Sequence, residues 1–299
     1  MKRNNVLALA ILAVIMVAAA VSSIAQTNNI TTAAMLTMKG HMVKSTMNNK
    51  TYQLYVSLPK KYSPADTAHY PVLYVLDGQY SFPSFFSIRE NLDMAREIDN
   101  VIIVAIADSS QSESGWIISR YTDYTPSHVP QMDSLWPKIM NVPAGSLKSG
   151  GALSFLGTIQ KDIIPFIEAH YKTNGSRGIS GHSLGGLFVS YCLLTAPGLF
   201  NSYGINSPAL WWNDKEILSL ENTFAKEHSG LAANVFISVG SLEGEPMVNP
   251  ITAFANALIS HNYKGLTVKS QIFDNETHVS VSAASNSRTL RVLYAPKTK

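Results

Sequence analysis

The sequence predicts an α/β fold in which a mostly parallel central sheet is flanked by helices. Residues 72–76 and 101–107 are short continuous apolar runs, which is typical of strands buried on both faces. Segments with helical spacing of apolar residues alternate with such runs along most of the chain. Because strands that alternate with helices form parallel sheets with right-handed crossovers, we expect one α/β domain.

The remaining elements follow from the same patterns. Two early segments are rich in alternating and β-branched residues and predict strands at 38–47 and 52–58, with a hairpin turn at 48–50. Later strands are expected at 178–181, 203–206, 235–239 and 266–273. Helices are expected at 85–98, 155–171, 184–194, 214–227, 251–261 and 280–293.

Residues 109–151 interrupt this alternation. The segment is rich in Ser, Pro, Gly, Trp and Tyr and shows no clear period, so it is predicted to be irregular. A segment of this length without regular structure is unusual inside a compact domain and tends to be functional. Because it follows a buried strand directly, we expect it over the carboxyl edge of the sheet, where ligands bind.

The N-terminus is typical of a secretory signal. Lys2 and Arg3 precede an unbroken apolar run at 6–21, and Ser23 and Ala25 stand at the two positions that a signal peptidase reads. The sequence therefore predicts a signal peptide at 1–25, cut before Gln26, and a single domain at 26–299 in the periplasm or outside the cell. The run is shorter than the roughly 18 residues of a membrane span, so an uncleaved anchor is the lesser alternative.

Composition excludes several classes of function. Apolar residues make up 46% of the chain, enough for a sizeable core, and the formal net charge is only +3. No run of five or more basic residues exists, so neither nucleic acid nor an anionic membrane is an expected partner. The one cysteine, Cys192, has no partner for an internal disulfide and lies in an apolar stretch, where a small buried hydrophobic side chain is expected.

The strongest chemical signal is the pentapeptide Gly181-His182-Ser183-Leu184-Gly185. A G-x-S-x-G pattern between an apolar strand and an apolar helix predicts the nucleophile elbow of an α/β-hydrolase fold. The chain there turns sharply from strand into helix and exposes the serine at the sheet edge. Ser183 is thus the predicted nucleophile.

A serine hydroxyl needs a base, and the sequence offers eight histidines. His278 is the best placed, because it follows the predicted strand 266–273 across a short polar loop, where this fold brings its base. The acid is expected between nucleophile and base in chain order. Glu243 and Glu245 both follow the strand 235–239; Glu243 is the first choice as the group that orients the imidazole, and Glu245 is the alternative.

An oxyanion hole needs two backbone donors. The amide of Leu184, the residue after the nucleophile, is one expected donor. The amide of Gln79, in the loop after strand 72–76, is the other, because Gly78 allows the backbone to approach closely. An ordinary Asp77-Gly78 turn is the alternative interpretation.

Five motifs together resemble the putative-esterase family of α/β-hydrolases, which includes esterase D, siderophore esterases, feruloyl and acetyl-xylan esterases, and mycolyltransferases. They are Leu76-Asp77-Gly78, Arg120 to Pro126, Gly181 to Gly186, Ser207 to Trp212, and Glu276-Thr277-His278. The likeness is strongest to the siderophore-esterase branch and spans residues 35–293. It implies hydrolysis of carboxylic esters with neither metal nor organic cofactor, and it supports Ser183, His278 and Glu243. Some siderophore esterases work with a Ser–His pair alone, and the second glutamate, Glu245, leaves the acid open.

Substrate contacts are expected from two places. Arg120 is predicted to bind an anionic or carbonyl-rich group of the substrate, or else to pair with Asp123 as a structural strut. Trp211 and Trp212 are predicted to wall an acyl pocket, with at least one of them packing in the core instead.

The combined prediction is an exported serine esterase that works through an acyl-serine intermediate. Its expected substrate is a small-molecule or carbohydrate-linked ester, such as a siderophore lactone or a feruloyl or acetyl-sugar ester. An acyltransferase on the same fold and a non-catalytic exported ligand-binding protein are the two alternatives.

Overall fold

The computed structural model describes residues 38–296 except 66 and 111. The predicted signal peptide and its cut before Gln26 lie outside these described residues. Gly40–Lys299 forms one compact unit.

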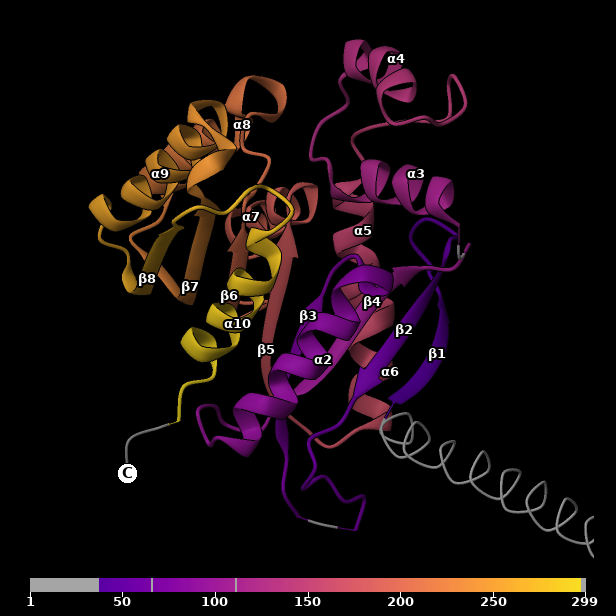
Figure 1. Ribbon diagram of the computed structural model, residues 1–299, viewed down its shortest axis with the longest axis vertical. Helices are drawn as coiled ribbons and strands as arrows, with labels where there is room; N and C mark the ends of the chain where they lie inside the picture. Colours follow the sequence, from indigo (N-terminus) through magenta and orange to yellow (C-terminus); the bar gives the residue numbers. More distant parts are fainter. Residues whose placement is uncertain (1–37, 66, 111, 297–299) are drawn as a thin grey trace, which may run out of the picture. The chain divides into compact units, whose positions relative to one another are not determined.

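A single sheet organises this unit (Figure 1). Within the described residues it has eight strands in the order β1-β2-β4-β3-β5-β6-β7-β8. The strands are β1 (Met38–Lys44), β2 (Thr51–Ser57), β3 (Tyr70–Val75), β4 (Ile102–Asp108), β5 (Thr173–His182), β6 (Ser202–Asn206), β7 (Gly230–Gly240) and β8 (Lys264–Phe273). From β4 to β8 the neighbours pair in parallel, whereas β2 pairs with β4 antiparallel. The predicted α/β-hydrolase fold with a mostly parallel sheet is confirmed.

Helices connect the parallel strands. They are α2 (Gly78–Met94), α3 (Glu113–Tyr124), α4 (Pro130–Ile139), α5 (Ala152–Thr158), α6 (Ile164–His170), α7 (Leu184–Thr195), α8 (Trp212–Glu227), α9 (Glu245–Ser260) and α10 (Val281–Leu293). A π-helical turn, Ile159–Ile163, joins α5 to α6, so the predicted helix 155–171 is one helical stretch with a local irregularity. The helix predicted at 85–98 begins seven residues earlier, and the turn-forming residues Gly78 and Pro83 obscured this start in the sequence.

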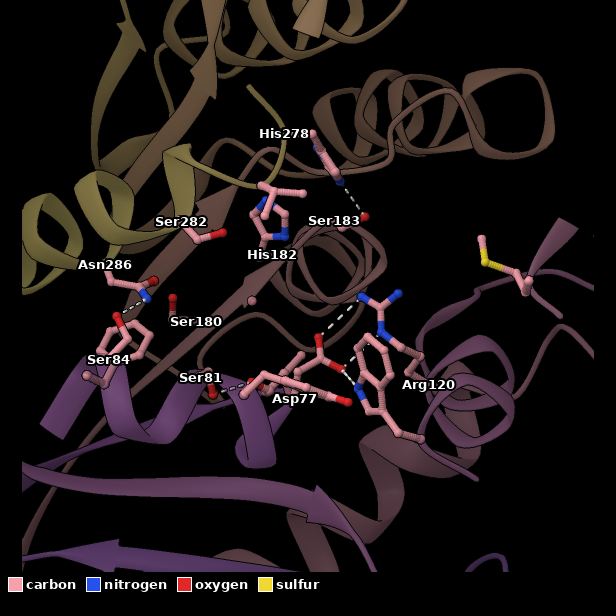
Figure 2. A pocket seen from close by; sticks show the side chains of 17 residues that line it. Asp77, Ser81, Ser84, Arg120, Ser180, His182, Ser183, His278, Ser282 and Asn286 are labelled. Atoms are coloured by element: carbon pink, nitrogen blue, oxygen red, sulfur yellow. Dashed lines mark hydrogen bonds and ion pairs between the residues drawn. The ribbon is translucent and has the colours of Figure 1, made fainter. Parts of the chain in front are cut away.

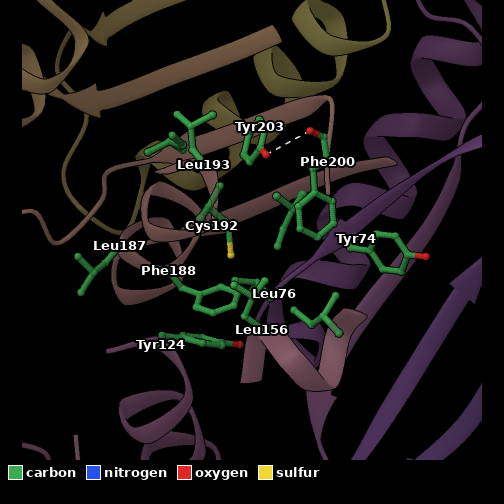
Figure 3. Close-up of a cluster of buried hydrophobic side chains, with 14 of the residues drawn as sticks. Tyr74, Leu76, Tyr124, Leu156, Leu187, Phe188, Cys192, Leu193, Phe200 and Tyr203 are labelled. Atoms are coloured by element: carbon green, nitrogen blue, oxygen red, sulfur yellow. Dashed lines mark hydrogen bonds between the residues drawn. The ribbon is translucent and has the colours of Figure 1, made fainter. Parts of the chain in front are cut away.

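Two cores lie on opposite faces of the sheet. Alternate strand residues point to opposite faces, so Leu73 and Val75 belong to one core, whereas Val72 and Tyr74 belong to the other. Helices α2 and α10 cover the smaller core. The larger core lies under α7 and its neighbours, and Figure 3 shows aromatic and aliphatic side chains closing around α7.

Cys192 lies within the larger core on α7. Its side chain is fully buried, and this burial raises the pKa of the thiol well above its ordinary value. The prediction of a small buried hydrophobic side chain is therefore confirmed.

The segment 109–151 corrects the sequence prediction, because it contains helices α3 and α4 rather than irregular chain. The Ser112 side chain caps α3 by accepting the Gly115 amide at 3.1 Å. Two prolines, Pro130 and Pro137, lie in α4 and break its sequence pattern, although proline at the first helical position is well tolerated. Helix α3 packs against α7 and β4, which places it at the carboxyl edge of the sheet as expected.

The described residues contain neither a helix suited to span a membrane nor a cluster of side chains suited to bind a metal ion. No helix within 38–296, residues 66 and 111 apart, combines the length and apolarity needed to cross a membrane. In the same part of the chain, no group of three or more His, Cys, Asp or Glu side chains is arranged to hold a metal ion.

Candidate active site

The predicted nucleophile stands at a sharp turn between β5 and α7. The backbone of Ser183 has φ 61° and ψ −121°, a conformation that residues other than glycine rarely adopt. A Cβ on Gly181 would collide with the backbone of Gly185, so the turn tolerates only glycine there. The Ser183 amide donates to the Asn206 carbonyl at 3.1 Å, which anchors the strained residue to β6. This geometry is that of a nucleophile elbow.

A continuous chain of hydrogen bonds leads away from the serine. His278 Nε2 lies 3.0 Å from Ser183 Oγ, and His278 Nδ1 lies 2.6 Å from Glu243 Oε2. The imidazole is 39% exposed, whereas the Glu243 side chain is fully buried. The three side chains come from the ends of β5, β7 and β8, so the sheet brings together residues that are 95 and 35 positions apart.

Glu243 is held as a carboxylate. Its Oε1 accepts the Gly240 amide at 2.7 Å and the Ser207 hydroxyl at 2.7 Å. Burial alone would raise the pKa of Glu243, but the hydrogen bonds from His278, Gly240 and Ser207 outweigh it and lower this pKa. An ionised, fixed carboxylate favours the imidazole tautomer whose Nε2 is free to accept a proton from Ser183.

The alternative acid lies elsewhere. Glu245 is the first residue of α9 and is exposed. Within the described residues, the carboxylate that contacts the His278 ring is that of Glu243. The geometry therefore favours Glu243 over Glu245.

Two neighbouring loops hold the acid and the base together. A Cβ on Gly240 would collide with the Glu276 carbonyl, so the loop after β7 approaches the loop after β8 at a glycine. The Leu242 amide donates to that same carbonyl at 3.0 Å, and the Asn275 amide donates to Ser241 Oγ at 2.9 Å. These contacts fix the spacing of Glu243 and His278, and no local sequence pattern predicted them.

A cavity of about 530 Å³ opens beside Ser183 (Figure 2). Its walls come from α2, α3, α10, the end of β5 and the residue after α4. The lining residues are Leu76, Asp77, Tyr80, Ser81, Ser84, Phe85, Trp116, Arg120, Met140, Ser180, Gly181, His182, Ser183, His278, Val279, Ser282 and Asn286. The volume is within the range of pockets that hold small organic ligands.

Arg120 lines this cavity but pairs with Asp77, not with Asp123 as one alternative expected. Its Nε donates to Asp77 Oδ1 at 3.0 Å and its Nη2 to Asp77 Oδ2 at 3.2 Å. Burial alone would lower the pKa of Arg120, but Asp77 outweighs it and the pKa is raised. The third nitrogen, Nη1, has no hydrogen-bond partner among the described residues. Arg120 is thus both anchored and able to donate to a ligand.

The comparisons with known proteins agree with this geometry. The family described as "Putative esterase" matches residues 45–279. The chain belongs to this family. The ferri-bacillibactin esterase BesA of Bacillus subtilis is 30% identical over 85% of this chain and 89% of its own length.

Two solved structures show the same fold. The BES protein from Bacillus cereus has a TM-score of 0.75 and 31% identity, covering 87% of this chain and 95% of its own. An IroE-like serine hydrolase from Shewanella oneidensis has a TM-score of 0.74 and 27% identity, covering 86% and 80%. This family member is accordingly an ester hydrolase with an α/β-hydrolase fold.

Asp123 has a structural place in this esterase. It is buried on α3 and accepts hydrogen bonds from Lys50 Nζ at 2.7 Å and from the Tyr52 hydroxyl at 2.9 Å. Burial raises the pKa of Asp123, although these two partners act against the rise. The pairing ties α3 to the strand β2 and leaves Arg120 to Asp77.

The neighbouring residues Trp211 and Trp212 lie in different environments. Trp212 is fully buried, so it is a packing residue. Trp211 is partly exposed and stacks on Trp136 of α4, with ring centroids 5.5 Å apart. Neither ring lines the cavity at Ser183. The expected substrate contact of Trp211 stays a prediction, and the tryptophan that lines this cavity in the described residues is Trp116.

The two predicted oxyanion donors lie in first helical turns. Leu184 begins α7 and Gln79 is the second residue of α2, and amides in these positions lack partners within their own helix. Gln79 also lines a separate small cavity. A Cβ on Gly78 would meet the backbone of Ile106 at 2.9 Å, so this glycine is required for packing on β4. The oxyanion roles of both amides stay predictions.

His182 is a site residue that was not predicted from the sequence. Its ring lies against the His278 ring, with centroids 4.5 Å apart and planes tilted by 42°. Burial, followed by the nearby His278 and Arg120, lowers the pKa of His182 to about 4. Its Nε2 is buried without a hydrogen-bond partner among the described residues. A neutral ring therefore lies beside the predicted base.

Proposed function

We propose that this esterase is a serine carboxylic-ester hydrolase with Ser183 as nucleophile, His278 as base and Glu243 as the residue that orients the base. The observation that carries this proposal is the unbroken series of hydrogen bonds from Ser183 through His278 to buried Glu243, at the wall of a cavity of ligand size. Nucleophile, base and orienting carboxylate in this order form a catalytic triad.

The acylation step follows from the atoms in contact. His278 Nε2 accepts the Ser183 proton while Oγ attacks the ester carbonyl carbon, which gives a tetrahedral intermediate. The imidazolium that forms is stabilised by the carboxylate of Glu243. Collapse of the intermediate breaks the bond to the alcohol oxygen, which takes the proton from His278, and leaves acyl-Ser183. Water then repeats the sequence and releases the acid.

The negative charge of the intermediate requires donors near the nucleophile. Leu184 is the first residue of α7. Its amide therefore lies at the positive end of the helix dipole, where backbone N–H groups have no partner within the helix. The amide of Gln79, in the first turn of α2, is proposed as the second donor. Loss of one such donor costs roughly 3 kcal/mol in enzymes of this type.

We propose a siderophore ester, a lactone rich in carbonyl oxygens, as the substrate class. The relatives are named as ferri-bacillibactin and enterobactin esterases. In this chain, Arg120 lines the cavity, and its Nη1 has no hydrogen-bond partner among the described residues, so it can donate to a carbonyl oxygen of the substrate. Feruloyl and acetyl-sugar esters are the competing substrates. A panel of these esters and siderophore lactones, assayed at equal concentration with the purified chain, decides between them.

Covalent trapping tests the serine mechanism. The chain is mixed with a p-nitrophenyl ester, acid-quenched during turnover, digested and analysed by mass spectrometry. We expect the acyl mass on the peptide that contains Ser183 and no adduct in Ser183→Ala. An adduct at another residue would refute the proposed nucleophile. Adding glycerol or a sugar distinguishes hydrolysis from acyl transfer, because transfer yields a new ester instead of the free acid.

We also propose that the chain is exported, on the basis of the pattern at residues 1–25. The full-length chain, expressed in a bacterium with a periplasm, should be recovered from the periplasm or the medium with Gln26 as its first residue. N-terminal sequencing measures this directly. A cell-associated product that retains Lys2 and Arg3 would favour the uncleaved anchor.

A further inference from the structure

The cavity beside Ser183 has two chemically different halves. On one side, Arg120 and Asp77 supply charge, together with the aromatic ring of Trp116. On the other side, α2 and α10 face each other across a space lined by uncharged polar side chains (Figure 2). We call this second half the α2–α10 arm and define it by Ser84, Phe85, Ser180, His182, Ser282 and Asn286.

Several polar groups in the α2–α10 arm are available to a ligand. Asn286 Nδ2 donates to Ser84 Oγ at 3.0 Å, which leaves the other end of the amide without a partner among the described residues. If the nitrogen and oxygen of the Asn286 amide exchange places, one of the two atoms still has no partner, because only one end of the amide faces Ser84. The Ser282 hydroxyl likewise has no hydrogen-bond partner in the described part of the chain. His182 Nε2 is buried and unpaired.

Of these groups, His182 Nε2 is fully buried, and an unpaired buried polar group is costly in a folded protein. Such groups persist where water or a ligand completes their hydrogen bonds. The α2–α10 arm carries no charged side chain at neutral pH, and the ring of its member His182 contacts the ring of His278. A neutral group with hydrogen-bonding capacity therefore suits this half of the cavity, whereas an anionic group suits the half at Arg120.

We propose that the α2–α10 arm is a second substrate subsite, which takes an uncharged hydroxyl or amide of the acyl group while the carbonyl carbon lies at Ser183. This inference rests on the proposed esterase function and adds a substrate feature to it. Ser180 precedes Ser183 by three residues, so their backbones are at most about 10 Å apart. The part of the α2–α10 arm at Ser180 therefore lies within about this distance of the nucleophile.

A matched pair of esters tests the subsite. The probes are p-nitrophenyl 6-hydroxyhexanoate and p-nitrophenyl heptanoate, which differ by a hydroxyl in place of a methyl at the chain end. The measured quantity is the ratio of kcat/KM for the hydroxy ester to that for heptanoate. Asn286→Leu keeps the side-chain size and removes the amide, so we expect this ratio to fall about tenfold, which corresponds to one hydrogen bond.

A second variant guards against a folding defect. Asn286 is buried and links α10 to α2, so Asn286→Leu risks lowering stability. Ser282→Ala removes a hydroxyl that has no partner among the described residues, and it should lower the ratio about threefold without lowering Tm. Ser287→Ala, on the same helix but outside the cavity lining, is the matched control and should leave the ratio at its wild-type value.

The outcomes separate the two proposals. If heptanoate is hydrolysed by the wild type and not by Ser183→Ala, the serine mechanism stands. If, in addition, Asn286→Leu and Ser282→Ala leave the ratio unchanged, or lower both kcat/KM values equally with a lower Tm, the subsite is refuted and these residues only join the helices. Equal hydrolysis by Ser183→Ala and the wild type would refute the esterase mechanism itself.

Discussion

The proposed triad at the carboxyl edge of the sheet (the reacting edge) and the segment that contains α3 and α4 are held in place by different kinds of contact. Ser183, Glu243 and His278 follow the carboxyl ends of the parallel strands β5, β7 and β8, so the sheet and the short loops after these strands set their distances. Helices α3 and α4 instead depend on side-chain contacts with distant parts of the chain, such as Arg120 with Asp77 and Trp136 with Trp211. The spacing of the proposed triad therefore depends mainly on the backbone, whereas the positions of α3 and α4 depend on side-chain contacts.

The largest expected effect is at the reacting edge. Ser183→Ala should lower kcat by about three to six orders of magnitude, because the triad residues act as a unit. Circular dichroism and Tm should remain near the wild type, since alanine removes only one hydroxyl. The rate of p-nitrophenyl acetate hydrolysis is the measurement. A variant that keeps more than a tenth of the activity would show that the reacting edge is not the site of catalysis.

The next effect distinguishes the two glutamates. Glu243→Gln should lower kcat by about two to four orders of magnitude, because the amide cannot hold the imidazole in the same tautomer. Glu245→Gln is the matched control: that side chain is exposed on α9, so kcat should change less than twofold. The reverse ranking would assign the acid to Glu245, and small effects from both would favour a Ser–His pair.

A smaller and selective effect is expected on α3, where Arg120 is proposed to bind the substrate. Arg120→Ala should lower the ratio of kcat/KM for a siderophore lactone to kcat/KM for p-nitrophenyl acetate by about ten- to a hundredfold, the loss of one charged hydrogen bond. Arg291→Ala, which breaks an exposed ion pair with Glu97, is the control. Equal losses on both esters with a lower Tm would mean that Arg120 is only a strut for Asp77.

The smallest effect concerns pH and stability. The pKa of His182 is lowered from 6.5 to about 4 in the folded chain. The unfolded chain thus binds a proton between these values that the folded chain does not, and stability falls as the pH falls from 6.5 toward 4. From pH 7 to 5 this component is about 2 kcal/mol. Urea unfolding of wild type and His182→Phe at both pH values measures it, and parallel losses in the two proteins would contradict the assignment.

The same contrast explains what the sequence predicted. Apolar runs located β3 and β4 and the elbow located Ser183, because these features depend on neighbours along the chain. The pairing of Arg120 with Asp77 spans 43 residues, and the approach of Gly240 to Glu276 depends on how two loops meet, so neither leaves a local pattern. Helices α3 and α4 were missed for a related reason. Their prolines, serines and aromatic residues are weak helix formers, and tertiary packing overrides that preference.

The reactivity of the Cys192 thiol can be used to measure how often α7 separates from the sheet. The Cys192 side chain, on the core-facing side of α7, is fully buried, and this residue is the one cysteine in the sequence. A thiol reagent will therefore modify the chain only when α7 separates from the sheet, and the modification rate under native conditions measures that opening. For the same reason, a single cysteine introduced on the exposed side of α4 can be labelled with a fluorophore in the folded chain without first replacing Cys192.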